Sequence, residues 1–173
     1  MNREIVVNIA DMKIAYRPNV LVTYALGSCV GVCLIDKVAG IGGMLHVMLP
    51  YSKDAINIEN KCKFADTGIN ELIKSMENIG ANRIYIKAKI AGGAQMFLGS
   101  SNSVIASIGH RNVEAVKKTL LGLNIPILAE DTGMNYGRTI RFYTDTGELL
   151  VDSINKGKKK LYLFQNYLHI LKA

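Results

Sequence analysis

A cysteine at a glycine-serine turn is the first candidate for chemistry in this chain. Cys29 follows Gly27 and Ser28 in the segment YALGSCVGVCLID, residues 24–36, and an apolar stretch comes directly after it. A turn that glycine permits can direct a thiol outward and leave backbone N–H groups free to bind an oxyanion. Cys29 is therefore either the nucleophile of an acyl-transfer reaction or a small apolar residue at the start of a strand.

A cysteine nucleophile needs a base, and the chain offers three histidines. His169 lies in the C-terminal segment, and His110 lies near the start of a predicted helix. His46 lies within the apolar segment GGMLHVML, residues 42–49, where a neutral imidazole would need a hydrogen-bond partner. It is either the base or a core histidine with satisfied hydrogen bonds, so the residues alone indicate no more than a candidate cysteine hydrolase.

A metal site is a less favoured interpretation of these residues. An extended segment 29–33 spans about 13 Å, which is too long for Cys29 and Cys33 to share one ion. A helix would bring the two thiols together, but CVGVCLI contains a glycine and β-branched residues and is a poor helix. We therefore expect no metal and no cofactor, and we interpret Cys33 and Cys62 as structural thiols.

Composition is typical of one globular domain. The chain has 173 residues, of which 49% are hydrophobic and 20% charged, and no apolar run reaches the roughly 20 residues of a membrane span. An odd number of cysteines without a secretion signal predicts reduced thiols and a cytoplasmic protein without membrane insertion. The net charge of +7 favours acidic partners. Because zinc-finger spacing and aromatic-basic motifs are absent, we expect an acidic protein surface rather than nucleic acid.

The elements that must position these residues are mostly strands. Short apolar segments between turn signals predict strands, whereas apolar spacings of three or four residues predict two amphipathic helices. The predicted strands are 19–25, 29–36, 41–50, 83–93, 125–131, 138–144 and 148–154, and the predicted helices are 66–80 and 112–124. The pattern indicates an α+β fold, with a layered, strand-rich core and outer helices.

Details of the helices and of the C-terminal segment follow from the same spacing. Asp66 is the predicted N-cap of the first helix and Gly80 its stop, and Leu121 is predicted to face inward on the second helix. We divide the chain into a domain of residues 1–154 and a basic, amphipathic extension of residues 155–173, predicted to be helical. That extension either docks on the core, binds a partner helix or lies on a membrane surface.

The ordered motifs resemble those of the CheD family of chemoreceptor glutamine deamidases. TYALGSCVGVCLID and GGMLHVMLP carry the resemblance, and it continues through KFADTGINELIKSMENIGA, AKIAGGAQMF, SIGHRNVEAVKKTL, IPILAEDTGMNYGR and DTGELLV. The resemblance thus covers residues 5–152. The chain departs from the family pattern after Ile154, so the resemblance implies nothing about the C-terminal segment.

The resemblance implies an activity, a site and a fold. Family members hydrolyse the side-chain amide of glutamines in methyl-accepting chemotaxis receptors, leaving glutamate. The family's catalytic cysteine, histidine and threonine match Cys29, His46 and Thr23, although Thr23 by itself is typical of a strand threonine with a satisfied hydroxyl. The implied fold is similar to the catalytic domain of cytotoxic necrotizing toxins, and implied partners are receptors and a CheC-type phosphatase.

Two further expectations concern partners. The segment GGAQMF, residues 92–97, lacks the Walker lysine and the Rossmann glycine spacing, so we predict a tight backbone approach at the rim of the site. Met96 and Phe97 would present apolar anchors there, unless Phe97 packs in the core. Alternatives to a deamidase are a non-catalytic module that regulates a CheC-type phosphatase, and a thiol peptidase with the same triad.

Overall fold

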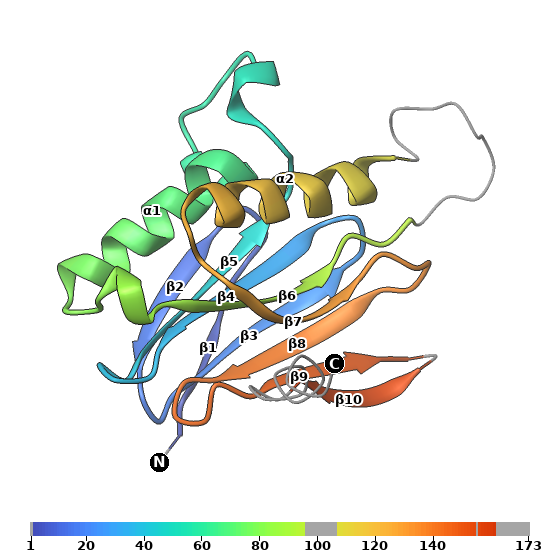
Figure 1. The fold of residues 1–173 in the computed structure, drawn as a ribbon. Helices are drawn as coiled ribbons and strands as arrows, with labels where there is room; N and C mark the ends of the chain where they lie inside the picture. The colour runs from blue at the N-terminus through green and yellow to red at the C-terminus, as the bar shows by residue number, and fades with distance from the viewer. Residues whose placement is uncertain (1, 96–106, 155, 162–173) are drawn as a thin grey trace, which may run out of the picture.

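The computed structural model describes residues 2–95, 107–154 and 156–161. These residues form three layers, in which two helices cover one face of a central sheet and an outer sheet covers the other face (Figure 1). The predicted α+β class is therefore confirmed. No helix in these ranges is both long enough and apolar enough to cross a membrane.

The central sheet has the strand order β2-β5-β4-β6-β7. Its two middle strands, β4 and β5, are buried at every position, because helices pack on one face and the outer sheet on the other. The bounds are β2 Met12–Tyr16, β4 Val30–Asp36, β5 Ile41–Val47, β6 Lys87–Gly92 and β7 Ile127–Thr132.

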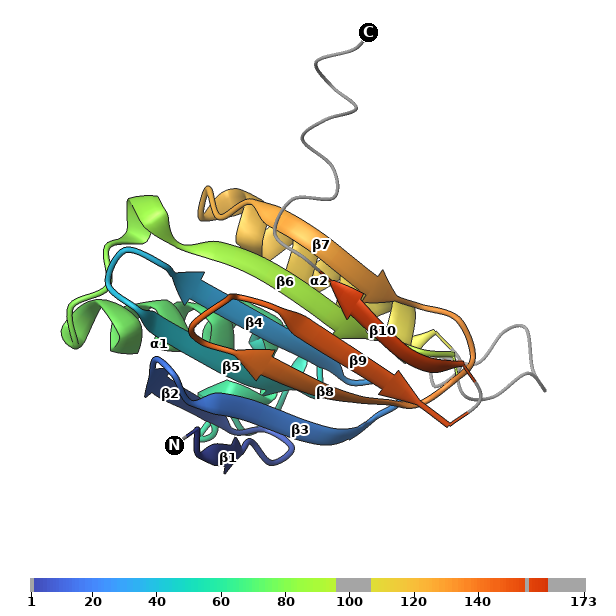
Figure 2. The same cartoon turned by 90° about the horizontal axis from the view of Figure 1, so that it is seen from below.

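The outer sheet has the strand order β1-β3-β8-β9-β10 and is in front in the view from below (Figure 2). Buried positions alternate with partly exposed ones along β8 and β9, as expected for strands that cover a core with one face. The bounds are β1 Glu4–Val6, β3 Val20–Leu26, β8 Arg138–Tyr143, β9 Leu149–Ser153 and β10 Gly157–Leu161.

Two hydrophobic cores hold the layers together. One lies between the central sheet and the helices α1 Ala65–Asn78 and α2 Ile108–Gly122. The other lies between the two sheets and contains Cys33, Met44, Ile140 and Phe142, among others. On β4 and β5, alternate residues face the two cores, so the face to which a residue belongs follows from its number.

The predicted strands and helices are confirmed, with differences at their ends. Residues 83–85 form a 3-10 helix, so the strand predicted from residue 83 begins at Lys87. Two further 3-10 helices, at 52–54 and 61–63, lie between β5 and α1, and the sequence does not predict β1 and β2. Gly80 follows α1 with a φ of 110°, consistent with the predicted stop.

Three predictions of detail are wrong. Asp66 is not the N-cap, because α1 begins at Ala65 and the Asp66 carboxylate instead accepts hydrogen bonds from the N–H and Oγ of Ser52. Leu121 is 77% exposed, since the buried stripe of α2 passes through Val116 and Leu120 and one further residue turns the side chain about 100° away. The residues of β10 are a strand rather than a helix.

β10 makes the first part of the predicted extension an edge strand of the outer sheet. It pairs antiparallel with β9, and two of its exposed lysines form ion pairs: Lys159 with the buried Asp131, and Lys160 with Glu148. The pairing with β9 and these ion pairs stabilise a strand where the apolar spacing predicts a helix. The rest of the predicted helix, and Met96 and Phe97, lie outside the described residues.

Candidate active site

Thr23 and His46 form a buried hydrogen bond between the two sheets. Thr23 lies on β3 and His46 on β5, and Thr23 Oγ1 is 2.8 Å from His46 Nδ1. The same hydroxyl donates a hydrogen bond of 2.7 Å to the carbonyl oxygen of Val7. Because a hydroxyl has one proton to donate, Thr23 must accept the proton of His46 Nδ1–H. The imidazole therefore carries its proton on Nδ1 and a lone pair on Nε2.

The Nε2 atom of His46 is ready to accept a proton. It is buried and has no hydrogen-bond partner among the described residues. Burial lowers the pKa of His46 to about 4, so the imidazole is neutral at pH 7. A neutral imidazole with an unpaired Nε2 lone pair is the form that a general base requires.

Cys29 shares the face of the central sheet from which His46 projects. His46 pairs with Gly31 across β4 and β5, and Cys29 stands two residues before Gly31, which makes Cys29 and His46 diagonal neighbours. Such neighbours lie about 7–8 Å apart or somewhat less between Cβ atoms. His46 and the half-buried Cys29 both project toward the space between the sheets, where Cys29 packs against the apolar core. The register thus brings a thiol and an imidazole to one end of the inter-sheet layer.

Burial keeps both groups neutral. It raises the pKa of the Cys29 thiol and lowers the pKa of His46. The resting site therefore holds a thiol beside a neutral imidazole rather than a thiolate beside an imidazolium. For Cys29 to act as a nucleophile from this state, a general base would have to remove its proton.

Three consecutive carbonyl groups fix the turn that carries Cys29. Ala94 N–H donates to Gly27 O at 2.7 Å and Gly93 N–H donates to Cys29 O at 2.7 Å. Between them, the side-chain Nδ2 of Asn112 donates to Ser28 O at 2.9 Å. The turn is thus anchored at every residue by two elements of the scaffold, β6 with its following loop and α2.

Glycine allows the close approach of the loop after β6. A Cβ on Gly92 would overlap the carbonyl oxygen of Cys29, and Gly92 and Gly93 both have positive φ, at 115° and 67°. The predicted tight backbone approach is confirmed for residues 92–95, the described part of that segment. Left-handed backbone just before the turn falls on Ala25 of β3, with a φ of 57°, where the pairing of β3 with β8 is irregular, and not on Gly27. Strained backbone held by its surroundings often marks functional sites.

The other thiols and His110 do not join this cluster. Cys33 is fully buried, and burial raises its pKa strongly, in keeping with the predicted structural thiol. Cys62 lies in a 3-10 helix outside the inter-sheet layer. His110 lies in the first turn of α2, as predicted, and His169 lies outside the described residues. No group of three or more His, Cys, Asp or Glu side chains in the described ranges is arranged to hold a metal ion.

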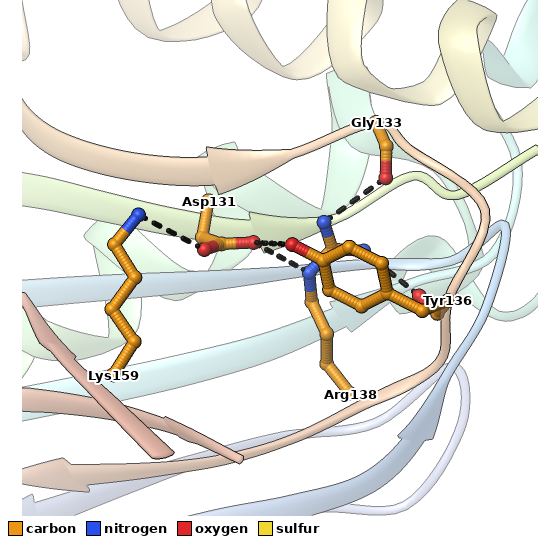
Figure 3. A network of polar contacts seen from close by, with 5 residues as sticks. All are labelled: Asp131, Gly133, Tyr136, Arg138 and Lys159. Atoms are coloured by element: carbon orange, nitrogen blue, oxygen red, sulfur yellow. Dashed lines mark hydrogen bonds and ion pairs between the residues drawn. The ribbon is translucent and has the colours of Figure 1, made fainter. Parts of the chain in front are cut away.

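A buried ion pair supports the loop next to the site (Figure 3). The Asp131 carboxylate binds Arg138 Nε at 2.7 Å, Lys159 Nζ at 3.2 Å and the Tyr136 hydroxyl at 3.3 Å. Arg138 also donates to the carbonyl oxygens of Tyr136 and Gly133, both at 3.0 Å. These partners hold the pKa of Asp131 below its usual range, although burial alone would raise it. The β7–β8 loop, residues 133–137, is thereby held in one conformation.

That loop and the loop after β6 are joined by hydrogen bonds and line a cleft. Gly133 N–H donates to Gly92 O at 2.9 Å and Gln95 N–H donates to Met134 O at 2.7 Å. A cleft of about 470 Å³ lies between these loops and the first turn of α2. Its lining residues are Gly93, Gln95, His110, Gly133, Met134 and Asn135. Of these lining residues, Gly93 donates its N–H to the carbonyl oxygen of Cys29, so the cleft adjoins the backbone of the turn that carries Cys29.

Sequence reasoning missed two supports of this site. The Asp131–Arg138 pair joins two predicted strands, and nothing in the spacing of these residues indicates that they meet. Asn112 gave a weak signal, because the prediction began the second helix at this polar residue, whereas α2 begins four residues earlier. In the helix that begins at residue 108, Asn112 lies on the buried face between apolar residues. A buried position of this kind is unusual for an asparagine.

Comparison with known proteins gives consistent matches. The family described as "CheD chemotactic sensory transduction" matches residues 48–153. A protein of Lachnoclostridium phytofermentans named probable chemoreceptor glutamine deamidase CheD is 52% identical over 161 residues, 93% of this chain and 100% of its own length. The chemoreceptor glutamine deamidase CheD of Halalkalibacterium halodurans is 48% identical over 162 residues, 93% of this chain and all of its own.

One solved structure aligns with part of this chain. A Neisseria meningitidis protein of the family DUF152 aligns with a TM-score of 0.48 and 9% sequence identity, over 77% of this chain and 64% of its own. A likeness of this size says nothing about chemistry. The predicted similarity to the cytotoxic necrotizing toxins stays a prediction.

Proposed function

Since this chain belongs to the CheD family, we propose that it is a chemoreceptor glutamine deamidase in which Cys29 is the nucleophile, His46 the acid–base and Thr23 the residue that orients the imidazole. The observation that carries this assignment is the hydrogen bond from His46 Nδ1–H to Thr23, which leaves an unpaired Nε2 on the same sheet face as Cys29. The reaction is protein-glutamine hydrolysis, which releases ammonia.

The first half of the reaction forms a thioester. His46 Nε2 takes the proton of the Cys29 thiol while the sulfur attacks the carboxamide carbon of the glutamine side chain. The imidazolium then donates that proton to the leaving nitrogen, the C–N bond breaks and ammonia departs. Thr23 accepts a hydrogen bond from Nδ1–H throughout, so the ring keeps the orientation in which Nε2 serves both transfers.

The second half hydrolyses the thioester. His46 Nε2 takes a proton from a water molecule as its oxygen attacks the thioester carbon. The C–S bond breaks, the glutamate side chain is released, and the proton returns to the sulfur of Cys29. Because burial disfavours the charged forms of both residues, the first half ends with the thioester and a neutral imidazole, and the second half ends with a neutral thiol and a neutral imidazole.

Backbone N–H groups of the turn are suitable oxyanion donors. The carbonyls of Gly27 and Ser28 accept hydrogen bonds from the scaffold, and the N–H of a trans peptide points opposite to its carbonyl. The N–H groups of Ser28 and Cys29 therefore face away from those anchors, and neither donates a hydrogen bond to another described residue. The tetrahedral intermediate places its negative oxygen next to the attacked carbon, within reach of the Cys29 N–H.

The partners of the enzyme are the cytoplasmic helices of chemoreceptors and a CheC-type phosphatase. A formal charge of +7 speeds the approach to an acidic helical surface, because complementary charge mainly raises the association rate. The phosphatase regulates the deamidase by covering the receptor-binding surface beside Cys29. Met96 and Phe97 are the candidate apolar anchors of that surface.

The experiment is deamidation of a purified receptor cytoplasmic fragment. Ammonia release is followed together with the gain of one mass unit at single glutamines, and Cys29→Ala is compared with Cys62→Ala, which changes a thiol outside the site. We expect Cys29→Ala to abolish both signals and Cys62→Ala to retain them. Activity of Cys29→Ala near the wild-type rate would move the nucleophile elsewhere, and a wild-type protein that binds the phosphatase without deamidation would support the regulatory module instead.

A further inference from the structure

Asn112 is a buried amide on a helix face that is otherwise apolar. It lies in α2 with no exposed surface, among the inward-facing Val113, Val116 and Leu120. Asparagine is a weak helix former, and a buried amide is costly unless it is hydrogen-bonded. A helix that only had to pack on the central sheet would be more stable with leucine at this position. The asparagine therefore requires a reason beyond packing.

The two hydrogen bonds of the amide provide that reason. Asn112 Nδ2 donates to Ser28 O at 2.9 Å and to Met48 O at 3.0 Å. Ser28 is the residue before Cys29, and Met48 is two residues after His46. A single amino group thus joins the turn of the nucleophile to the end of the strand that carries the base.

The bond to Ser28 has a direct effect on Cys29. Ser28 C=O and Cys29 N–H belong to the same peptide group, and the only cis peptide in the described ranges is Arg17–Pro18. In a trans peptide the two dipoles are opposed, so a carbonyl held by Asn112 fixes the Cys29 N–H on the other side. Without that bond, the peptide between Ser28 and Cys29 would have no side-chain anchor on its carbonyl.

The second polar atom of Asn112 shows that this arrangement is not optimised for stability. Both carbonyls are acceptors, so the amino group must face them, and Oδ1 lies buried on the other side without a partner among the described residues. A buried acceptor left unpaired carries a desolvation cost. Such a cost in a native protein calls for an explanation, and a role in catalysis supplies one.

We propose that Asn112 is a positioning residue, which orients the Ser28–Cys29 peptide so that Cys29 N–H binds the oxyanion of the tetrahedral intermediate. The inference rests on the proposed deamidase function and adds a residue to it. Asn112 does not touch the substrate, so it acts on the rate of the chemical step rather than on substrate binding.

The test compares Asn112→Leu with Val116→Ala. The first keeps the number and branching of the side-chain heavy atoms and loses both donors, whereas the second perturbs the same buried face of α2 without a bond to the turn. Each variant is measured for kcat and KM on the receptor fragment, for melting temperature, and for the alkylation rate of Cys29 by iodoacetamide at alkaline pH. Alkylation is a displacement at carbon without an oxyanion, so it reports the thiol alone.

We expect Asn112→Leu to lower kcat by about 10²-fold, the usual loss for one oxyanion donor, with KM and the alkylation rate within about threefold of the wild type. Val116→Ala is expected to lower the melting temperature and leave kcat unchanged. Should Asn112→Leu fail to fold, Asn112→Ser enters the same comparison.

Three results would overturn the inference. A kcat of folded Asn112→Leu within about threefold of the wild type shows that the amide is dispensable. An equal loss of kcat in Val116→Ala reduces Asn112 to a packing residue. A parallel loss of alkylation shows damage to the thiol or its base instead of the oxyanion donor. If wild-type protein releases no ammonia, the proposed function fails and the inference fails with it, whereas active wild type with active Asn112→Leu refutes only the inference.

Discussion

Replacement of Thr23 by valine tests the hydrogen-bond chain that sets the imidazole. Valine has nearly the shape of threonine, so the change removes one hydroxyl with little effect on packing. It removes the 2.8 Å bond to His46 Nδ1 and the 2.7 Å bond to Val7 O. Both sites are buried, so the imidazole and the carbonyl lose partners that water does not replace.

The magnitude follows from these two bonds. An unpaired buried group costs about 1–3 kcal/mol, so for two such groups we expect the free energy of unfolding to fall by about 2–6 kcal/mol. The hydrogen bond to Thr23 favours the tautomer and ring orientation that leave Nε2 unprotonated. Its loss reduces the free-energy advantage of that state over the alternatives by about 1–3 kcal/mol, which corresponds to a decrease in kcat of about 5- to 150-fold. KM is expected to remain unchanged, because Thr23 lies behind the imidazole, away from the substrate.

The assay measures kcat from ammonia release and the free energy of unfolding from urea titration, with Thr23→Ser as the matched control. Serine keeps the hydroxyl and loses one methyl group, so we expect near wild-type kcat and a loss of stability of about 1 kcal/mol. Nitrogen NMR of the imidazole reports the tautomer directly. A valine variant with kcat within twofold of the wild type, or with the proton still on Nδ1, would refute the role of this bond.

Three further predictions follow from the same geometry. His46 has a pKa of about 4 in the folded protein and an ordinary pKa near 6.5 in the unfolded chain, so the unfolded chain binds the proton first as pH falls. We therefore expect the free energy of unfolding to be at its full value above pH 6.5 and to decrease by about 3 kcal/mol on acidification to pH 4. Urea titrations across this pH range measure the decrease. The acid limb of kcat/KM should likewise lie near pH 4. Asp131→Asn leaves the buried Arg138 guanidinium without its countercharge and should cost about 3–5 kcal/mol in chemical denaturation. Gly92→Ala forces a Cβ into the carbonyl oxygen of Cys29 at a φ of 115°, so we expect a loss of at least about 2 kcal/mol together with a decrease in kcat.

Matched controls separate these effects from general damage. His46→Gln should remove most of the pH dependence of the free energy of unfolding between pH 4 and 6.5. If that pH dependence is unchanged, another titrating group causes it. Glu130→Gln breaks an exposed pair with Lys117 and should cost no more than about 1 kcal/mol. Gly122→Ala, at a helical position with no atom within 4 Å of the added Cβ, should stabilise by about 0.5–1 kcal/mol. A Gly92→Ala variant as stable as Gly122→Ala would contradict the close approach.

The sequence carried much of the fold and only the centre of the site. Strands β3, β4 and β5 could be predicted because short apolar segments between turns leave few alternatives, and the buried His46 could be recognised as needing a partner. Spacing alone did not identify that partner as Thr23, because β3 and β5 belong to different sheets. The resemblance supplied the pair, and the hydrogen bond supports it.

What could not be predicted depends on contacts between distant segments. The two bonds of Asn112 join it to residues 84 and 64 positions away, and no local pattern records such a distance. The apolar spacing of the C-terminal residues predicts a helix, but residues 157–161 form the strand β10. The spacing does not show that Lys159 pairs with Asp131 of β7, or Lys160 with Glu148, the residue before β9. Leu121 was misplaced by a single residue, which on a helix is enough to exchange core for solvent.

The neutral thiol of the resting site has a consequence for the life of the protein in a cell. Peroxide and related oxidants react with thiolates, and a cysteine whose pKa is raised by burial carries little thiolate. Cys29 is therefore slow to form sulfenic acid in the resting protein, and its proposed role as nucleophile requires His46 to remove the proton of the thiol. Hydrogen bonding in the turn and burial between two sheets thus give the enzyme a chemical durability that an ion-paired cysteine would lack.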